Sequence, residues 1–560
     1  MSGAKLISPR TAILIVIGTV ALVFLPMALL GIPDGFDLLQ HMRFAAAYEH
    51  AIRIGEIIPK WGGADNFGFG SIGVRYYPPL AYIVIALVHI ATGDWYTSFW
   101  TTAFVWILAG ALGVFVLVKE HASTDAALAA AIVYVILPFH TFEIYQAVLY
   151  AEFAATGLLP FCFLALTRLC RRGSWGDAAF FAIVYALLVL THIPSAMIGT
   201  AGMVIYGLGM LEWRRFWQRS IKLAAAGVFV AAATAFHLAK AIPELTWVQH
   251  NSPKFFTQGS YDYRSLLFPI YFSAPYVRYI QKLLWNLDLI VVVTVIVFII
   301  GAVTILVRRS KISAEENKFA LVTSIAALVS IFFLSIASTL IWDAVPTLQK
   351  IQFPWRWLEL TSLMTAVVIG MASTYLLFRH GRLSRPGVYT AVLLLLAICL
   401  FDVSQQIIPS SPLDRQQFQR RIDGMYNEEA CDCWWPIWAR REAFDDKAAS
   451  ASDRGVVSIS RTDEQLRFQV DRGEGTSLRV PVFYHPFWRA TVNGSATEVL
   501  PDANGAITLP LPTDAANVDL TFTEPDYLAP LRWLAAGVWI AAALFVLAWI
   551  VMQFRRTSTL

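Results

Sequence analysis

Two carboxylates and a histidine stand at helical spacing directly after the first long apolar segment. In the stretch GIPDGFDLLQH, Asp34, Asp37 and His41 occupy positions i, i+3 and i+7, so a helix that begins there would present all three on one face. Its other face would be apolar, as in a helix that lies on a membrane surface. Capping by Asp34 and a favourable helix-dipole interaction of Asp37 would explain the acids without chemistry. Capping and the helix dipole explain less well why a carboxylate and an imidazole lie together immediately after a membrane span.

A further acid lies inside an apolar run. Glu152 falls a turn or two within the run 147–168, and a charge inside a membrane span is costly unless it faces a cavity or a partner. His192, in LTHIPSA, falls at the turn between two short apolar runs. The topology inferred below brings Asp37, His41, Glu152 and His192 to the outer leaflet. A buried histidine with a satisfied hydrogen bond explains His192 equally well.

Cations are expected at the same depth. Arg75 precedes Tyr77 and two prolines, Lys240 ends an apolar run, and Lys350 and Arg356 flank the sequence FPW. Arginine binds phosphate with a planar fork and lysine as a point charge. Acids, imidazoles and cations together suit the transfer of a group from a lipid phosphate, in which a carboxylate deprotonates the acceptor hydroxyl and cations stabilise the departing phosphate. Snorkelling to the headgroups would account for any single cation.

The composition places these residues in a membrane protein. Of the 560 residues 57% are hydrophobic and 15% are charged, against about 25% charged in an ordinary soluble domain. The mean hydropathy is +0.58. The net charge of +4 is small and no basic stripe is present, so the sequence gives no reason to expect a nucleic-acid partner.

About twelve membrane spans are predicted, which makes the fold a mainly α polytopic helical bundle. The first, without a cleavage site, is interpreted as an uncleaved signal anchor. The spans lie near 11–31, 97–118, 124–140, 147–168, 177–191, 195–211, 222–240, 286–307, 318–341, 357–378, 388–406 and 531–553.

Basic loops set the orientation, because short loops rich in lysine and arginine stay cytoplasmic. One more apolar run, 78–92, would move most of them outside if it crossed the membrane, so it is interpreted as a re-entrant or juxtamembrane helix. Both termini are then cytoplasmic, in a bacterial inner membrane. The basic loops are Arg171-Arg172, Arg214 to Lys222, Arg308 to Lys311, Arg379 to Arg385 and Arg555-Arg556.

Three parts of the chain are expected from this pattern. Residues 1–406 form a transmembrane domain with a juxtamembrane loop at 32–96, residues 407–530 form an extracytoplasmic domain, and residues 531–560 form a last span with a cytoplasmic tail. In the second part, short alternating stretches separated by turn residues predict a small antiparallel β-sandwich, with a hairpin at Asn493-Gly494. The sequence leaves open whether Cys431 and Cys433 are joined.

Several motifs resemble those of a known superfamily. They are IPKWGGADNFGFG, YYPPL, a span with an internal glutamate, THIP, FPWRW and FYHPFWRATVNG. Together they are similar to the C-type (GT-C) membrane glycosyltransferases, which use polyprenyl-phosphate sugars. More narrowly, they resemble the bacterial and archaeal membrane family named "6-pyruvoyl-tetrahydropterin synthase-related".

The resemblance implies an inverting transferase. It would move a sugar from a polyprenyl-phosphate donor to a glycan, lipid or protein acceptor at the outer face. An acid in the first outside loop would be catalytic base or metal ligand, which by position is Asp37, with Asp34 second. The superfamily's second acid corresponds to Glu143 or Glu152. No DxD pair occurs in the first loop, so no metal ligand is assigned, although Mg or Mn would be the divalent cation to expect. His41, Arg75, Tyr77, His192, Lys350 and Arg356 are the expected substrate-binding residues.

Two other classes of function fit the same composition. A transporter or lipid flippase would need polar residues through the membrane depth and often internal repeats, whereas the ionisable residues here gather at one face. A non-catalytic envelope assembly protein could share the fold, because a fold does not certify activity.

Overall fold

The structure is a computed structural model that describes residues 7–258, 261–270, 278–308, 313–373 and 410–557, with single positions at 397, 401 and 404. The chain divides into two compact units. Unit 1 comprises Met1–Leu38, Thr92–Ala231 and Phe256–Phe418, and unit 2 comprises Leu39–Ala91, Ala232–Phe255 and Gln419–Leu560.

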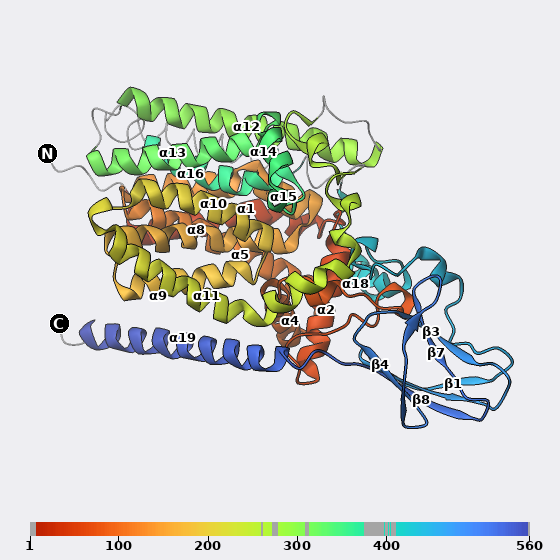
Figure 1. Ribbon diagram of the computed structural model, residues 1–560. Helices are drawn as coiled ribbons and strands as arrows, with labels where there is room; N and C mark the ends of the chain where they lie inside the picture. The colour runs from red at the N-terminus through yellow and green to blue at the C-terminus, as the bar shows by residue number, and fades with distance from the viewer. Residues whose placement is uncertain are drawn as a thin grey trace. The chain divides into compact units, whose positions relative to one another are not determined.

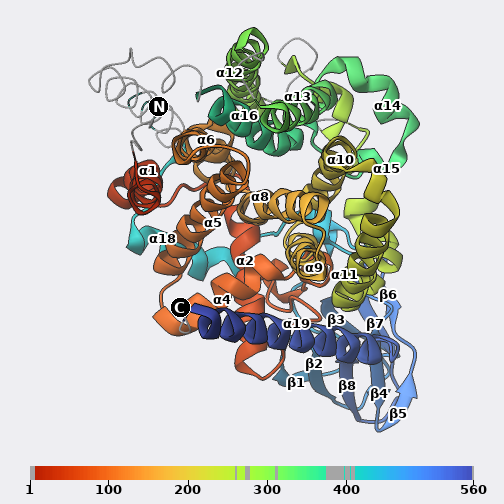
Figure 2. The same cartoon turned by 90° about the vertical axis from the view of Figure 1, so that its left-hand side faces the viewer.

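Unit 1 is a bundle of long apolar helices that run roughly alongside one another (Figure 1). Viewed from one end, α16 lies beside α6, α12 and α13, and α8 lies beside α5 and α9 (Figure 2). Helices α5 and α8 approach closely, because a Cβ on Gly157 would lie 2.6 Å from the backbone oxygen of Trp106. The main helices are α1 (Pro9–Leu30), α5 (Trp95–Lys119), α6 (Thr124–Ile136), α7 (Pro138–Phe142), α8 (Tyr150–Arg171), α9 (Trp175–Val189), α10 (Ile193–Met210), α11 (Phe216–Glu244, which continues into unit 2), α12 (Arg278–Arg308), α13 (Ala314–Leu334), α14 (Thr339–Ala344), α15 (Pro346–Gln349) and α16 (Leu358–Ser373).

Polar caps fix where several of these helices begin. The carboxylate of Asp94 accepts from the backbone N–H of Thr97 at the start of α5. Helix α9 begins with a reciprocal capping box between Ser174 and Asp177, and the same arrangement begins α13. These side chains satisfy backbone donors that the first turn of a helix leaves without partners.

Nine helices in the described part of the chain are long and apolar enough to span a membrane. They correspond to nine of the predicted spans, so a multi-pass membrane protein is confirmed. Of the remaining three, 177–191 is the shorter apolar helix α9, and 357–378 is described as α16 up to Ser373. Most of 388–406, like the basic loop from Arg379 to Arg385, lies outside the described residues. A total of twelve spans therefore stays a prediction.

The basic loops of unit 1 gather at one end of the bundle. Arg171, at the end of α8, pairs with Glu315 at the start of α13 over 2.6 Å. Arg219 donates to the backbone oxygen of Arg171, and Lys318 donates to that of Met210 at the end of α10. Two of the loops predicted to be cytoplasmic, Arg171-Arg172 and Arg214 to Lys222, thus meet, as the charge rule requires if they share one side of a membrane.

Unit 2 contains the β-structure that the alternating sequence predicts. A five-stranded sheet has the order β1-β2-β8-β4-β5 and a three-stranded sheet the order β3-β7-β6, and every pairing is antiparallel. Asn493 and Gly494 join β4 to β5 with positive φ angles of 51° and 82°, which confirms the hairpin turn. The strands are β1 (Val456–Arg461), β2 (Gln465–Val470), β3 (Ser477–Phe483), β4 (Trp488–Val492), β5 (Ser495–Thr497), β6 (Leu500–Pro501), β7 (Ala506–Pro510) and β8 (Ala516–Phe522).

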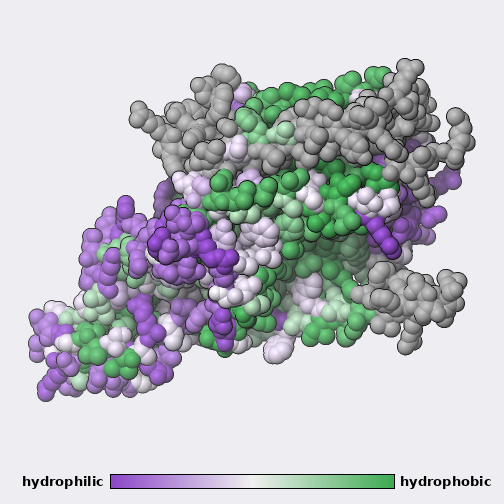
Figure 3. Space-filling view, turned by 180° about the vertical axis from the view of Figure 1, so that it is seen from behind, coloured by the Kyte–Doolittle hydropathy of each residue, from purple (hydrophilic) through white to green (hydrophobic). Residues whose placement is uncertain are grey.

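Helices and a disulfide complete unit 2. The run 78–92 forms the short apolar helix α4, too short to appear among the nine candidate spans. Cys431 and Cys433, left open by the sequence, are joined. In Figure 3 the surface of the β-strands is mostly hydrophilic, whereas the helices of unit 1 carry broad hydrophobic areas. The helices are α2 (Leu38–Arg53, which begins at the last residue of unit 1), α3 (Gly73–Tyr76), α4 (Leu80–Thr92), α18 (Arg415–Gly424, which begins in unit 1) and α19 (Leu528–Thr557).

Candidate active site

A buried ion pair lies at the end of unit 1 opposite the basic loops. Arg356 donates from Nε to Oε2 of Glu152 over 2.8 Å, although 204 residues separate them. Glu152 is in the first turn of α8 and Arg171 in its last, so their Cα atoms are about 28 Å apart along the helix axis, close to the thickness of a bilayer core. The ion pair and the basic loops therefore belong to opposite faces of the bundle.

The loop before α16 fixes the guanidinium group of Arg356. The short helix η12 (Pro354–Trp357) carries it, and its Nη1 donates to the backbone oxygen of Ile351 over 2.6 Å. The guanidinium carbon lies 4.9 Å from the centroid of the Phe353 ring. Ser330 of α13 donates to the backbone oxygen of Trp357 and anchors the turn. Arg356 is 8% exposed and reaches the cluster from a rigid support.

Two residues with unusual backbone conformations stand close to this pair. Val148 has φ of 53°, and Gln352 has φ of 70°. A β-branched residue rarely adopts positive φ, because its side chain clashes with the backbone. Val148 follows a π-helical turn, η2 (Glu143–Ala147), and ends it four residues before Glu152. Such strain persists only where surrounding structure enforces it, and it is often found at functional sites.

Two more buried carboxyl groups face the ion pair. Glu143 interacts electrostatically with Glu152, Glu359 and Arg356. Glu359, in the first turn of α16, meets the hydroxyl of Ser195. The same hydroxyl is 2.7 Å from Nδ1 of His192, which is 2% exposed. The cluster therefore brings three glutamates and a histidine around one guanidinium group.

Asp37 lies at the edge of this cluster. Its backbone N–H donates to the carbonyl of Ala147 over 3.0 Å, which ties the segment after α1 to the π-helical turn. Gly35 makes the approach possible, since a Cβ there would lie 2.2 Å from Cγ2 of Val148 and 2.7 Å from the backbone oxygen of Gln146.

Asp37 is a half-buried residue. Burial raises its pKa to about 6, Arg356 opposes this shift, and Glu152 adds to it. The group can therefore exchange a proton near neutral pH.

Some polar atoms of the cluster make no hydrogen bond with any residue that the structure describes. Within the described residues, both carboxyl oxygens of Glu143 and Oε1 of Glu152 are buried and make no hydrogen bond. Buried polar atoms without partners are uncommon and are frequently binding positions. The part of the chain that the structure describes contains no group of three His, Cys, Asp or Glu side chains suited to hold a metal ion.

Three other expected site residues lie in the second compact unit. His41, Arg75 and Tyr77 belong to unit 2, where His41 is 2.7 Å from the hydroxyl of Tyr82 and Arg75 forms ion pairs with Glu244 and Glu524. Tyr77 packs against aromatic side chains of the same unit.

Lys350 and the segment that carries Asp34 and Asp37 differ from the expected arrangement in separate ways. Lys350 is exposed in unit 1 and lies over the ring of Phe256 at 4.4 Å. The expected helix face is wrong: α2 begins at Leu38, so Asp34 and Asp37 precede it and do not share a helical face with His41. Backbone pairing of this segment explains the difference, because Ile32 exchanges hydrogen bonds with Leu413 and Asp34 donates its N–H to Ser410.

Glu359 was not among the residues expected at the site. The residue follows FPWRW by one position and stands at the start of an apolar run, in WLELTS. An acid at such a position carries the same signal that identified Glu152. Glu143, weighed above as an alternative to Glu152, belongs to the same cluster.

Comparison with known proteins identifies one family and several solved structures of low similarity. A family model described as "6-pyruvoyl-tetrahydropterin synthase related domain; membrane protein" matches residues 74–410. No curated protein matches the chain.

Three of the similar solved structures show how low the sequence identity and the structural similarity are. Arabinofuranosyltransferase AftD from Mycobacteria is 14% identical, with a TM-score of 0.47, and the match covers 74% of this chain and 28% of that one. The Archaeoglobus fulgidus oligosaccharyltransferase is 12% identical, with a TM-score of 0.41 and coverages of 77% and 60%. Arabinosyltransferase EmbB from Mycobacterium smegmatis is 12% identical, with a TM-score of 0.37 and coverages of 93% and 64%. The chain spans less than two thirds of each of them, and these values are too low to assign an activity.

Proposed function

We propose that this chain, which belongs to the family described as 6-pyruvoyl-tetrahydropterin synthase related membrane proteins, is a membrane glycosyltransferase. It would transfer a sugar from a polyprenyl-phosphate donor to an acceptor hydroxyl at the extracytoplasmic face, with inversion. The observation that carries the proposal is the electrostatic interaction of the carboxyl group of the half-buried Asp37 with the buried guanidinium group of Arg356, at the end of the bundle opposite the basic loops.

Asp37 is proposed as the general base. In one displacement, its carboxylate takes the proton of the acceptor hydroxyl, the acceptor oxygen forms a bond to the anomeric carbon, and the bond from that carbon to the phosphate oxygen breaks. The polyprenyl phosphate leaves with the bonding electron pair. A pKa raised to about 6 favours this role, because a base is most effective when its pKa lies near the working pH.

Arg356 is proposed to stabilise the leaving phosphate. The two hydrogen bonds that hold it, to Glu152 and to Ile351, use donors on Nε and Nη1. Guanidinium groups bind phosphate oxygens through parallel N–H bonds, and a preorganised donor of this kind stabilises charge that develops in the transition state.

The glutamates are proposed to position both partners of the reaction. Glu152 holds the guanidinium group of Arg356 in place. The oxygens of Glu143 that make no hydrogen bond within the described residues are acceptors that the hydroxyl groups of a sugar could satisfy. The sugar, the length of the lipid and the acceptor class are not specified by these contacts.

A pair of isosteric substitutions tests the base. Asp37→Asn keeps the shape of the side chain and removes its ability to take a proton, so transfer should fall by about 10² to 10⁴-fold. Asp34→Asn makes the same chemical change three residues away and should have little effect. The assay would measure the product of transfer from a polyprenyl-phosphate pentose or hexose by the purified full-length protein in liposomes.

The outcome separates the candidate functions. Full transfer by the Asp37 variant rules out the proposed base, and a loss confined to the Asp34 variant would assign the role to that residue. Accumulation of a labelled solute or lipid across the bilayer, with no transfer to any acceptor, would instead favour a transporter or flippase.

A further inference from the structure

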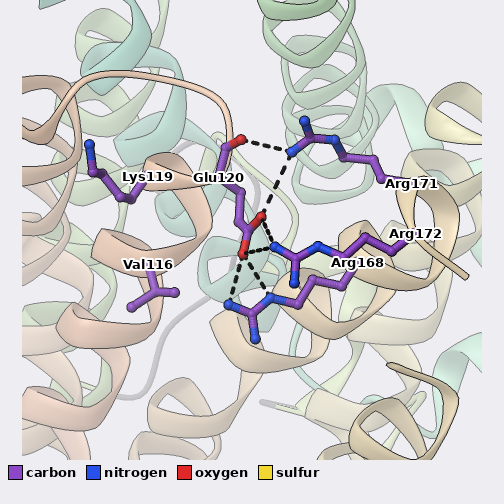
Figure 4. A pocket seen from close by; sticks show the side chains of 6 residues that line it. All are labelled: Val116, Lys119, Glu120, Arg168, Arg171 and Arg172. Carbon is purple, nitrogen blue, oxygen red and sulfur yellow. Dashed lines mark hydrogen bonds and ion pairs between the residues drawn. The ribbon is translucent and has the colours of Figure 1, made fainter. Parts of the chain in front are cut away.

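A charged cavity lies at the end of unit 1 where two of the basic loops meet. Its volume is about 620 Å³, and Figure 4 shows its lining side chains. Val116, Lys119 and Glu120 come from α5 and the residue after it, and three arginines come from the last turn of α8 and the residue after it. The lining residues are Val116, Lys119, Glu120, Arg168, Arg171 and Arg172.

Glu120 gathers the three arginines around one point. Its Oε1 accepts from Nε of Arg168 over 2.8 Å, and its Oε2 accepts from Nη2 of Arg172 over 2.8 Å. Its backbone oxygen accepts from Nη1 of Arg171 over 2.7 Å. The side chain of Glu120 is only 12% exposed, whereas the arginine side chains are 29% to 59% exposed. A mostly covered carboxylate thus holds the guanidinium groups of three arginines that line the cavity (Figure 4).

The charges do not balance within the cavity. Four cations and one carboxylate line it. Two further acids stand outside the lining, because Glu315 pairs with Arg171 and Asp125 interacts electrostatically with Lys119. Even with both counted, the cations are in excess. Guanidinium groups held in place in this way are suited to bind the oxygen atoms of a phosphate group.

The position of the cavity favours a lipid as the source of that phosphate. It lies at the ends of two helices long enough to span a membrane, α5 and α8. Cations at such ends commonly snorkel outward as separate side chains, but here three converge on one carboxylate and line one open pocket. Basic pockets between membrane helices on the cytoplasmic side are typical sites for anionic headgroups.

We propose that this cavity binds the phosphate group of an anionic phospholipid in the leaflet opposite the Asp37 site. Lys119 and Arg172 contact the headgroup at the mouth, and Arg168 and Arg171 hold the phosphate oxygens deeper in the cavity. The proposal concerns a cluster separate from the candidate active site and holds whether or not the protein is a glycosyltransferase.

Two charge-matched double variants test the proposal. Lys119→Gln with Arg172→Gln removes two exposed cations of the cavity, and Arg214→Gln with Arg215→Gln removes two exposed cations from another loop predicted to be cytoplasmic. Lipid retention by the purified full-length protein is measured by native mass spectrometry, after exchange into phosphatidylglycerol or phosphatidylcholine. Inorganic phosphate is titrated separately against the lipid-free protein. Thermal unfolding checks that each variant is folded.

The wild-type protein should retain phosphatidylglycerol in preference to phosphatidylcholine. The cavity variant should lose about tenfold in affinity for phosphatidylglycerol, as expected for two charge-assisted contacts, and the loop variant should bind as the wild type does. Equal losses in both variants would mean diffuse attraction and would overturn the proposal, as would the absence of any lipid preference. Binding of inorganic phosphate that the cavity substitution abolishes, without lipid retention, would identify a soluble phosphate compound and overturn the lipid assignment.

Discussion

The two ends of α8 carry charged clusters of opposite composition. At its first turn, three buried glutamates surround one arginine, Arg356. In its last turn and at the residue after it, three arginines surround one carboxylate, Glu120, and remain partly open to solvent. The same helix thus presents an acidic, buried site at one face of the bundle and a basic, accessible one at the other.

Burial decides what each cluster can do. A buried charge is costly without a partner, so the inner contacts of the Arg356 cluster are strong and specific. Partly exposed pairs contribute little to stability, because water screens them, and they remain available for a ligand. We therefore expect substitutions at the Arg356 end to affect folding and chemistry, and substitutions at the Glu120 end to affect binding.

Arg356→Gln should have the largest effect on stability. Removing the guanidinium group leaves Glu152 buried without its partner, which should lower the free energy of unfolding by about 3 kcal/mol. Denaturation of the purified protein in mixed micelles measures this loss. The double variant with Glu152→Gln should recover part of it, and a loss no larger than that of an exposed arginine would contradict the buried ion pair.

Gly35→Ala should reduce transfer while leaving the protein folded. The added methyl group would meet Val148 and the backbone of Gln146, so the Asp37 segment must shift. A displacement of a catalytic group of this size should lower kcat by about tenfold or more. Gly18→Ala in α1 is the matched control, because a Cβ there meets nothing within 4 Å. Equal activities of the two variants would exclude the close approach as the feature that positions Asp37.

The dependence of transfer on pH should report Asp37 directly. Because its pKa is raised to about 6, mainly by burial, the base is ionised above that value, and the rate at pH 5 should be about one tenth of the plateau. The same shift means that the folded state binds the proton more tightly than the unfolded state. The contribution of Asp37 to the free energy of unfolding is therefore fully present below pH 3.8, which is the ordinary pKa of the group. This contribution is lost as the pH rises through about 6. A rate that does not change between pH 5 and 7 would exclude Asp37 as the base.

Arg172→Gln should have the smallest effect on stability. Its side chain is 59% exposed, so loss of its pair with Glu120 should change the free energy of unfolding by less than about 1 kcal/mol. The free energy of unfolding is measured by the same denaturation experiment as for Arg356→Gln. The difference between the losses in the two variants tests the contrast between the ends of α8. A large loss would show that the Glu120 cluster supports the fold.

Much of the fold follows from local sequence patterns. Apolar runs of membrane length predict spans wherever they occur, and nine of the twelve were found within the described residues. Alternation and turn residues such as Asn493-Gly494 predict the strands and the hairpin. The basic loops predict which helix ends lie on the same side of the membrane, because short loops rich in lysine and arginine stay on the cytoplasmic side. Each signal depends on residues close together in the chain.

The candidate site required contacts that no local pattern contains. Spacing suggested that Asp34, Asp37 and His41 share one helical face, yet backbone pairing holds the two acids in the segment before α2, which begins only at Leu38. An acid inside an apolar run predicts that Glu152 has a partner but does not identify it. Only the packing of α8 against the helices around it selects Arg356, 204 residues away, and adds Glu359. Burial, and with it the raised pKa of Asp37, exists only once those helices are assembled.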